Sequence, residues 1–144
     1  MSFDFRIEKG DFRIGPDGDI AKVENTAKLR QEILKMVITP AGANPQFPWY
    51  GSLISASLVG SPFDMDFNVS FAENHLRNSL ETLQRLQQEQ TKVQRVTPFE
   101  QLAAISGISI QRNRIDPRFF HVDIRCLTRA LSEIETGFSV NSLL

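Results

Sequence analysis

The sequence predicts a single α+β domain in which two main helices cover one face of a small mixed or antiparallel sheet. Two segments carry apolar residues at the spacings of an amphipathic helix, and others alternate apolar with polar residues, as half-buried strands do. A length of 144 residues suits one domain with its own hydrophobic core. We therefore expect residues 1–144 to form one domain, with 1–10 and 132–144 considered as extended arms.

Composition and charge narrow the classes of protein that the chain can belong to. Hydrophobic residues make up 41% and charged residues 23%, which are ordinary values for a soluble globular protein. The formal net charge is −1, so neither nucleic acid nor an anionic membrane is an expected partner. No signal peptide and no membrane span is visible in the sequence. The single Cys126 excludes an internal disulfide framework and fits a reducing compartment.

The N-terminal part predicts two or three short strands. Residues 3–7 alternate aromatic or aliphatic with charged side chains, and residues 12–14 repeat this pattern. Residues 15–18, Gly-Pro-Asp-Gly, form a strong turn signal before a short extended stretch over 20–23. The pattern leaves open whether the first strand joins the main sheet or reaches a neighbouring subunit.

The first main helix is predicted to begin at Asn25 or Thr26, because either side chain can accept hydrogen bonds from first-turn amides. Its apolar stripe consists of Leu29, Ile33, Met36 and Val37. Pro40 ends the helix, since the residue before a proline disfavours helical backbone angles. The loop that follows ends in the aromatic stretch 47–50, and we expect Trp49 to return to the core beside this stripe.

The second main helix is predicted from Ser70 to about Val93. Ser70 and Glu73 have the spacing of a capping box. Residues 63–69 show little periodicity and are interpreted as a loop. The apolar stripe consists of Leu76, Leu80, Leu83 and Leu86. The opposite, polar side is interpreted as a solvated helix surface.

The C-terminal part predicts one short helix followed by strands. Residues 97–100, Thr-Pro-Phe-Glu, have the features of a helix start, and Gly107 would end that helix. Residues 108–127 predict a β-hairpin whose turn is Asp116-Pro117-Arg118. One face of its second strand carries Phe120, Val122, Ile124 and Cys126. Residues 134–140 alternate again and predict one more strand.

The residue types needed for metal or covalent chemistry do not converge in the sequence. Only His75 and His121 are available as imidazole ligands, and Cys126 alternates onto the face opposite His121. No nucleophile has a neighbouring base in the sequence pattern, and no glycine-rich phosphate loop occurs. We therefore expect no metal, no cofactor and no catalytic residue.

One set of carboxylates keeps an enzymatic alternative open. Asp64, Asp66 and Glu73 lie close together in the sequence among aromatic residues. Glycoside hydrolysis uses two carboxylates on either side of the bond, so this set is the candidate for a peptidoglycan-cleaving enzyme. Aspartates ahead of a helix serve as turn and cap residues far more often, and that interpretation is preferred.

A set of motifs carries a family resemblance. In order, they are the strand Gly18–Val23, Leu-Arg-Gln-Glu-Ile-Leu at 29–34, Ile-Thr-Pro-Ala-Gly at 38–42, Asn44-Pro45 and Tyr-Gly-Ser-Leu at 50–53. Together they resemble the sheath-initiator, or baseplate wedge, family of contractile phage tails, which is related to a type VI secretion baseplate component. The match is clear over 18–53 and continues more weakly to about Leu131.

The resemblance implies a structural baseplate protein and not an enzyme. In that family the domain joins the wedge and central hub to the first ring of sheath subunits by β-strand addition. The implied partners are the tail sheath subunit, baseplate wedge proteins and tail tube or hub proteins, with several copies in a baseplate ring. The implied location is the virion tail, assembled in the host cytoplasm. A peptidoglycan hydrolase and an adaptor unrelated to tails remain the alternatives.

The resemblance also implies a wedge contact at the end of the second main helix. Relatives carry a Glu-Pro-Arg triplet there, where they meet the central helical bundle. Glu89 matches the glutamate, whereas Gln90 and Thr91 replace the proline and arginine, and Lys92 follows one place on. Lysine does not replace the forked arginine in a two-bond contact. Asp116-Pro117-Arg118 has similar chemistry but lies in the hairpin turn.

The predicted hairpin supplies the candidate edge for strand addition. Of its strands, 108–115 and 119–127, the first carries more charge and is predicted to be the open edge. The candidate residues are Ile108, Ile110, Gln111, Arg112 and Arg114. Charges on an edge strand discourage pairing with wrong partners, which suits an edge that must wait for one partner.

Overall fold

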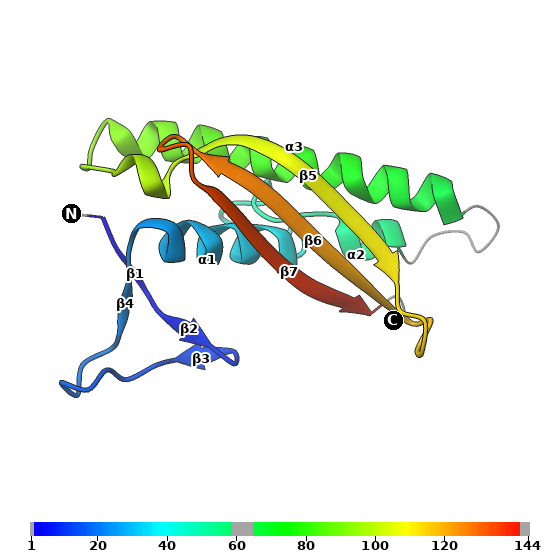
Figure 1. Ribbon diagram of the computed structural model, residues 1–144, viewed down its shortest axis with the longest axis horizontal. Coiled ribbons are helices and arrows are strands. Elements are labelled where there is room, and N and C mark those ends of the chain that lie inside the picture. Colours follow the sequence, from blue (N-terminus) through cyan, green and yellow to red (C-terminus); the bar gives the residue numbers. More distant parts are fainter. Residues whose placement is uncertain (1, 59–64, 142–144) are drawn as a thin grey trace.

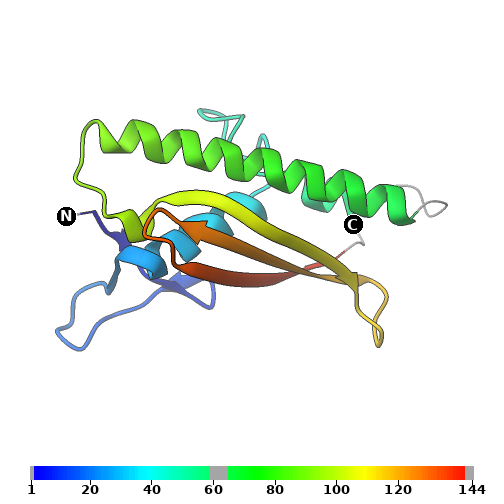
Figure 2. The same cartoon turned by 45° about the horizontal axis from the view of Figure 1, so that its top comes forward.

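The core of the fold is an antiparallel sheet of three strands in the order β5-β6-β7, packed on two helices (Figure 1). The computed structural model describes residues 2–58 and 65–141. The strands are β5 (Leu102–Arg112), β6 (Phe119–Thr128) and β7 (Glu133–Asn141), and the helices are α1 (Asn25–Ile38), α2 (Ile54–Leu58) and α3 (Met65–Thr91). Figure 2 shows α1 and α3 on the same side of the sheet, so the predicted α+β fold with two main helices on one face is confirmed.

The N-terminal strands do not join this sheet. β1 (Asp4–Phe5) pairs with β4 (Lys22–Val23), and β2 (Ile7–Glu8) pairs with β3 (Asp11–Phe12). The N-terminal ribbon, defined as residues 3–23, projects away from the helices in Figure 1. Of the two possibilities that the sequence left open, the one in which the first strand joins the main sheet is therefore wrong.

Polar contacts hold the N-terminal ribbon on α1. The Gln31 amide donates to the carbonyl of Phe5 at 2.7 Å and to the Asp4 carboxylate at 2.9 Å, while its oxygen accepts from the Ile7 amide. Lys35 adds an ion pair with Asp4. Partial burial raises the pKa of the Asp4 carboxyl, but hydrogen bonds from Lys35 and Gln31 outweigh it, so the pKa lies below its usual value.

The buried face of α1 agrees with the prediction, but its N-cap does not. Leu29, Ile33, Met36 and Val37 are all essentially inaccessible. The N-cap residue is Glu24, which makes no side-chain capping bond, so the prediction of Asn25 or Thr26 as a cap is wrong. The Asn25 side-chain oxygen instead accepts from the Thr97 hydroxyl at 2.6 Å. The helix ends at Ile38, before Pro40, as expected.

The aromatic stretch after α1 returns to the core only at Tyr50. Trp49 is 51% exposed and Phe47 is 48% exposed, so the prediction that Trp49 packs in the core is wrong. The reason lies in how the loop closes: the Ser52 amide donates to the Thr39 carbonyl at 2.8 Å. This fold-back brings Tyr50 inward and leaves the residues before it on the surface.

α3 begins earlier than the sequence pattern predicts. It starts at Met65, so Ser70 is an interior residue, the capping box is wrong and the predicted loop is helical from residue 65. The rest of that predicted loop lies outside the described residues. Glu73 forms an ion pair with Arg77 one turn on, at 3.3 Å. Packing explains the extension, because Ala72 is fully buried and α2 lies against this end of α3.

The predicted apolar stripes meet in one core. Leu76, Leu80 and Leu83 are buried and Leu86 is partly buried, as predicted. The predicted face of β6 is also buried: Phe120, Val122, Ile124 and Cys126 are at most 1% exposed. Burial raises the pKa of the Cys126 thiol to about 11, so this side chain is a protonated, apolar core group at neutral pH.

The predicted helix at 97–107 is wrong: a 3₁₀ turn and the first part of a strand take its place. Only Pro98–Glu100 forms a single 3₁₀ turn, η1, and β5 then begins at Leu102 and passes through Gly107, where its register shifts. The Gln87 side chain explains the change: its oxygen accepts from the Leu102 amide at 2.8 Å and its nitrogen donates to the Glu100 carbonyl. This contact from α3 fixes the start of the strand.

The rest of the sheet follows the prediction. The hairpin between β5 and β6 has its turn at 116–118, and Ile110 lies opposite Val122. The sequence allows the segment 132–144 to be either an extended arm or a strand. In the structure, Glu133–Asn141 pairs with β6 along its length. The described part of the C-terminal segment is therefore a strand of the sheet.

Candidate partner-binding surfaces

The sheet has two lateral edges, because β6 is the central strand. β5, which the sequence favours as the joining strand, forms one edge, and β7 forms the other. An edge strand can accept a further strand only through amides and carbonyls that point away from its neighbour. The direction of each backbone group therefore decides which residues are available.

On the second half of β5 the outward backbone groups belong to Ile108, Ile110 and Arg112. The Asn113 amide donates to the Phe119 carbonyl at 2.8 Å, and antiparallel pairing alternates residue by residue from there. Gln111 therefore points its amide at β6, opposite His121, and not at the open edge. Of the predicted residues, Ile108, Ile110 and Arg112 fit strand addition by backbone direction, whereas Gln111 does not.

The first half of β5 is already covered by α3. The Gln84 amide donates to the carbonyls of Leu102 at 3.2 Å and Ala103 at 2.9 Å. Figure 1 shows α3 running beside this half of the strand. The uncovered part of the β5 edge is therefore short.

The predicted arginines lie at the far end of β5. The Arg112 guanidinium lies over the Phe120 ring, 5.3 Å from its centroid. Arg114 is exposed in the turn beyond the strand. The strand ends at Arg112 and not at residue 115, so the prediction that Arg114 lies on this strand is wrong.

The β7 edge is longer and more open. The Thr128 amide donates to the Ser132 carbonyl at 2.9 Å, which fixes the alternation on this side of the sheet. The residues whose backbone groups point outward are Glu133, Glu135, Gly137 and Ser139. Within the described chain, no hydrogen bond from outside the sheet reaches their backbone groups, and no element runs beside the second half of this edge in Figure 1.

The predicted wedge residues lie together at the end of α3. Glu89 and Lys92 form an exposed ion pair with an N–O distance of 2.7 Å. The Gln90 amide donates to the Ser2 hydroxyl at 3.0 Å, and the Thr91 hydroxyl donates to the carbonyl of Gln88. Gln90 thus fastens the start of the chain to α3, and Glu89 and Lys92 are the exposed charges.

The structure adds Trp49 and Arg85 to this surface. A pocket of about 290 Å³ beside Glu89 is lined by Trp49, Thr82, Arg85 and Leu86. Phe47 packs edge-on against Trp49, with ring centroids 5.7 Å apart. Tryptophan and arginine are the residue types that most often dominate binding energy at interfaces. The sequence signal for an exposed Trp49 was its position after Pro48 in a loop of successive turns.

In the described chain, the candidate carboxylates Asp64, Asp66 and Glu73 do not form a paired catalytic site. Asp64 lies outside the described residues, and the side chain of Asp66 is not among those described. Glu73 is ion-paired with Arg77. The His75 ring contacts Phe71, and His121 contacts Asp123 at 3.1 Å.

Residues 2–58 and 65–141 contain neither a candidate metal-binding cluster nor a candidate membrane span. No group of three or more His, Cys, Asp or Glu side chains there is arranged to hold a metal ion. None of the helices there combines the length and apolarity that a membrane span requires.

The Asp116-Pro117-Arg118 segment, which resembles the wedge triplet in chemistry, does not lie beside the predicted wedge residues. Its Asp116 and Arg118 side chains pair within the hairpin turn at 2.7 Å, and Figure 1 shows this turn at the opposite end of the molecule from the end of α3.

No protein-family model and no curated protein sequence matches this chain. The function is therefore inferred from the surfaces of the domain. These are the open sheet edges, the exposed surface around Trp49 and the end of α3, and a pocket in the N-terminal ribbon.

Proposed function

We propose that the protein is a structural component of a contractile-tail baseplate whose sheet accepts a β-strand from a sheath subunit. The observation that supports this most is the open β7 edge, where the backbone groups of Glu133, Glu135, Gly137 and Ser139 point outward. An incoming strand would satisfy these groups by main-chain hydrogen bonds, and its alternate side chains would provide specificity.

We favour β7 over β5 as the joining edge. β5 offers Ile108 and Ile110, but Gln84 already occupies the carbonyls near its start. On β7 the side chains of the outward residues are exposed, so pairing would not disturb the core. Glu133 and Glu135 supply the charges that keep such an edge from pairing promiscuously.

The surface around Trp49 is the proposed wedge contact. Arg85 and Glu89 are four residues apart on α3 and therefore lie on the same helical face. They place a guanidinium group and a carboxylate beside an exposed tryptophan. Arg85 would then take the role of the arginine that the related proteins carry at the position of Thr91. A helical partner could pack on Trp49 and Leu86 while its polar side chains meet Arg85 and Glu89.

The test of this proposal is co-purification with the sheath subunit and wedge proteins encoded in the same genome. We expect the folded protein to retain both, and Trp49→Ala to lose the wedge proteins while retaining the sheath subunit. Trp49→Ala is a suitable separating variant because its side chain is half exposed and lines a pocket that contains no residue of β7. A folded wild-type protein that retains neither partner would contradict the proposal.

The peptidoglycan hydrolase remains the alternative, and no contact in the described chain favours it. We expect purified protein to release no soluble fragments from peptidoglycan, because Glu73 is held by Arg77 and no second described carboxylate faces it. The measurement is fragment release by the wild type beside Asp64→Asn, Asp66→Asn and Glu73→Gln. Activity that disappears in any of these variants would establish an enzyme.

A further inference from the structure

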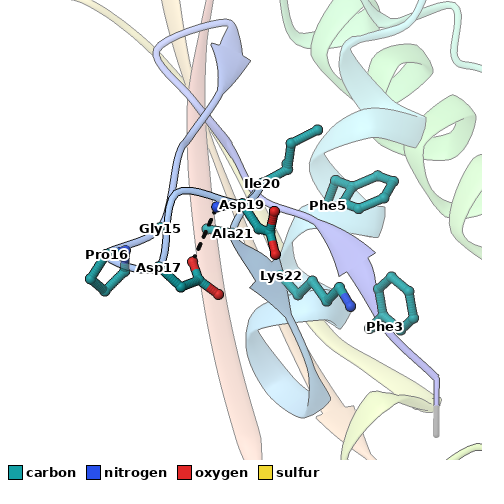
Figure 3. A pocket seen from close by; sticks show the side chains of 9 residues that line it. All are labelled: Phe3, Phe5, Gly15, Pro16, Asp17, Asp19, Ile20, Ala21 and Lys22. Carbon is teal, nitrogen blue, oxygen red and sulfur yellow. Dashed lines mark hydrogen bonds between the residues drawn. The ribbon is translucent and has the colours of Figure 1, made fainter.

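The N-terminal ribbon contains a pocket that the proposed function does not use. Its volume is about 740 Å³, within the usual range of roughly 300–1,000 Å³ for small-ligand pockets. Apolar side chains of Phe3, Phe5 and Ile20 and charged side chains of Asp17, Asp19 and Lys22 line it. Figure 3 shows the two phenylalanine rings on one side, Asp17 on the other and the Asp19 carboxylate between them.

The apolar residues of this pocket keep much of their surface exposed. Phe5 is 41% exposed and Ile20 is 38% exposed, although both belong to a folded ribbon. The ribbon is attached to α1 through the polar contacts of Gln31 and Lys35. Apolar surface that stays exposed in a concave site is typical of a binding surface.

The charges of the pocket indicate what it would bind. The Asp17 carboxylate accepts from the Asp19 amide at 3.3 Å within the turn. The Asp19 carboxylate itself has no hydrogen bond or ion pair with any described residue. The Lys22 ammonium lies over the Phe3 ring, 4.3 Å from its centroid, so that ring face already holds a cation. The apolar walls and the Asp19 carboxylate therefore suit a ligand that carries an apolar side chain next to a positive charge.

The chain itself carries this combination at its opposite end. Ile115, in the turn between β5 and β6, is 95% exposed, more than any other large apolar residue of the described chain. Arg114 precedes it and is exposed. The Asn113 side-chain oxygen accepts from the backbone amides of Ile115 and Asp116, at 2.8 and 3.2 Å, which fixes the turn. A side chain held outward by a fixed turn loses little entropy on binding.

We propose that the hairpin tip of one copy occupies the ribbon pocket of a second copy. Ile115 would pack against Phe5 and Ile20, and Arg114 would pair with Asp19. The ribbon and the tip lie at opposite ends of the molecule (Figure 1), so the contact is head-to-tail. Repetition of such a contact gives a closed ring or an open filament. The proposal stands independently of any sheath or wedge partner.

Sedimentation equilibrium of the full chain over a range of concentrations tests this contact. One tip inserted into one pocket is a small interface, so we expect weak, concentration-dependent self-association. Ile115→Ser should weaken it by about ten- to a hundredfold, because an isoleucine loses its burial. The matched control is Leu131→Ser, which changes a 78% exposed leucine in the turn between β6 and β7 and should leave association unchanged.

A charge-reversal pair tests the orientation of the contact. Arg114→Asp and Asp19→Lys should each be monomeric alone, because the tip and pocket then carry the same sign of charge. An equimolar mixture of the two variants should associate again, since each tip now faces a pocket of opposite charge. Raising the salt concentration should weaken the association of both the wild type and the mixture.

Three results would overturn the proposal. The first is a wild type that stays monomeric at all concentrations at which it is soluble. The second is self-association that neither Ile115→Ser nor Arg114→Asp changes. The third is an equimolar mixture of Arg114→Asp and Asp19→Lys that fails to associate although both variants are folded. Circular dichroism checks folding. If Asp19→Lys alone unfolds, the two tip variants decide the matter, because both side chains are exposed and neither contributes to the core.

Discussion

Ile33→Ala is expected to lower the free energy of unfolding by about 2–5 kcal/mol. The Ile33 side chain has no exposed surface, and α1 packs against both α3 and β7. Removing it deletes buried apolar contacts and leaves a cavity where the helices meet the sheet. Each kcal/mol lowers the melting temperature of a domain of this size by about 2–4 °C, so we expect a drop of roughly 5–15 °C in thermal unfolding followed by circular dichroism.

The same substitution on the exposed side of α1 is the matched control. Ile38 is 57% exposed and lies at the end of the same helix. Ile38→Ala should change the free energy of unfolding by no more than about 0.5 kcal/mol, as surface substitutions usually do. Equal melting temperatures for Ile33→Ala and Ile38→Ala would show that the assigned buried face of α1 is wrong.

The buried faces of the helices and strands could be predicted because apolar residues recur in the sequence at the period of each element. Ile33 and Leu80 recur at helical spacing with their neighbours, and Val122 alternates with charged residues. These patterns depend only on which side of an element meets the core. They identified both main helices, the hairpin and the last strand.

Element ends and loop side chains could not be predicted, because contacts distant in the sequence determine them. Met65 begins α3 although Ser70 offers the better local cap, since α2 packs against that end. Leu102 begins a strand because Gln87 binds its amide from α3. Trp49 is on the surface because the loop closes at Ser52. No local propensity contains this information.

The same limit applies to the candidate sites. Alternation in 108–112 identifies the faces of a strand but not whether its flank is covered, and Gln84 covers part of β5. Nor does alternation give the direction of an amide, so Gln111 was placed on the open edge although it faces β6. Trp49 and Arg85, which are far apart in the sequence, line one pocket only in the fold.

The direction of each amide makes proline substitution a sharp test of strand addition. Ser139→Pro removes an outward amide from β7 and costs no hydrogen bond within the sheet, so the domain should remain folded. Gln111→Pro removes an amide directed at β6 and should lower the melting temperature. The comparison separates an edge amide from one used in the sheet.

Ser139→Pro is expected to weaken sheath-subunit binding by at least about tenfold, because a joining strand loses one hydrogen bond and meets the proline ring. Ser139→Ala is its matched control: it keeps the amide and should bind normally. Ile110→Pro, compared with Ile110→Ala, reports on the β5 edge in the same way. The measurement is sheath-subunit binding to the folded variants and sheath growth on baseplates that contain them. Normal sheath growth with Ser139→Pro and failure with Ile110→Pro would move the joining edge to β5, and normal growth with both would exclude strand addition at this sheet.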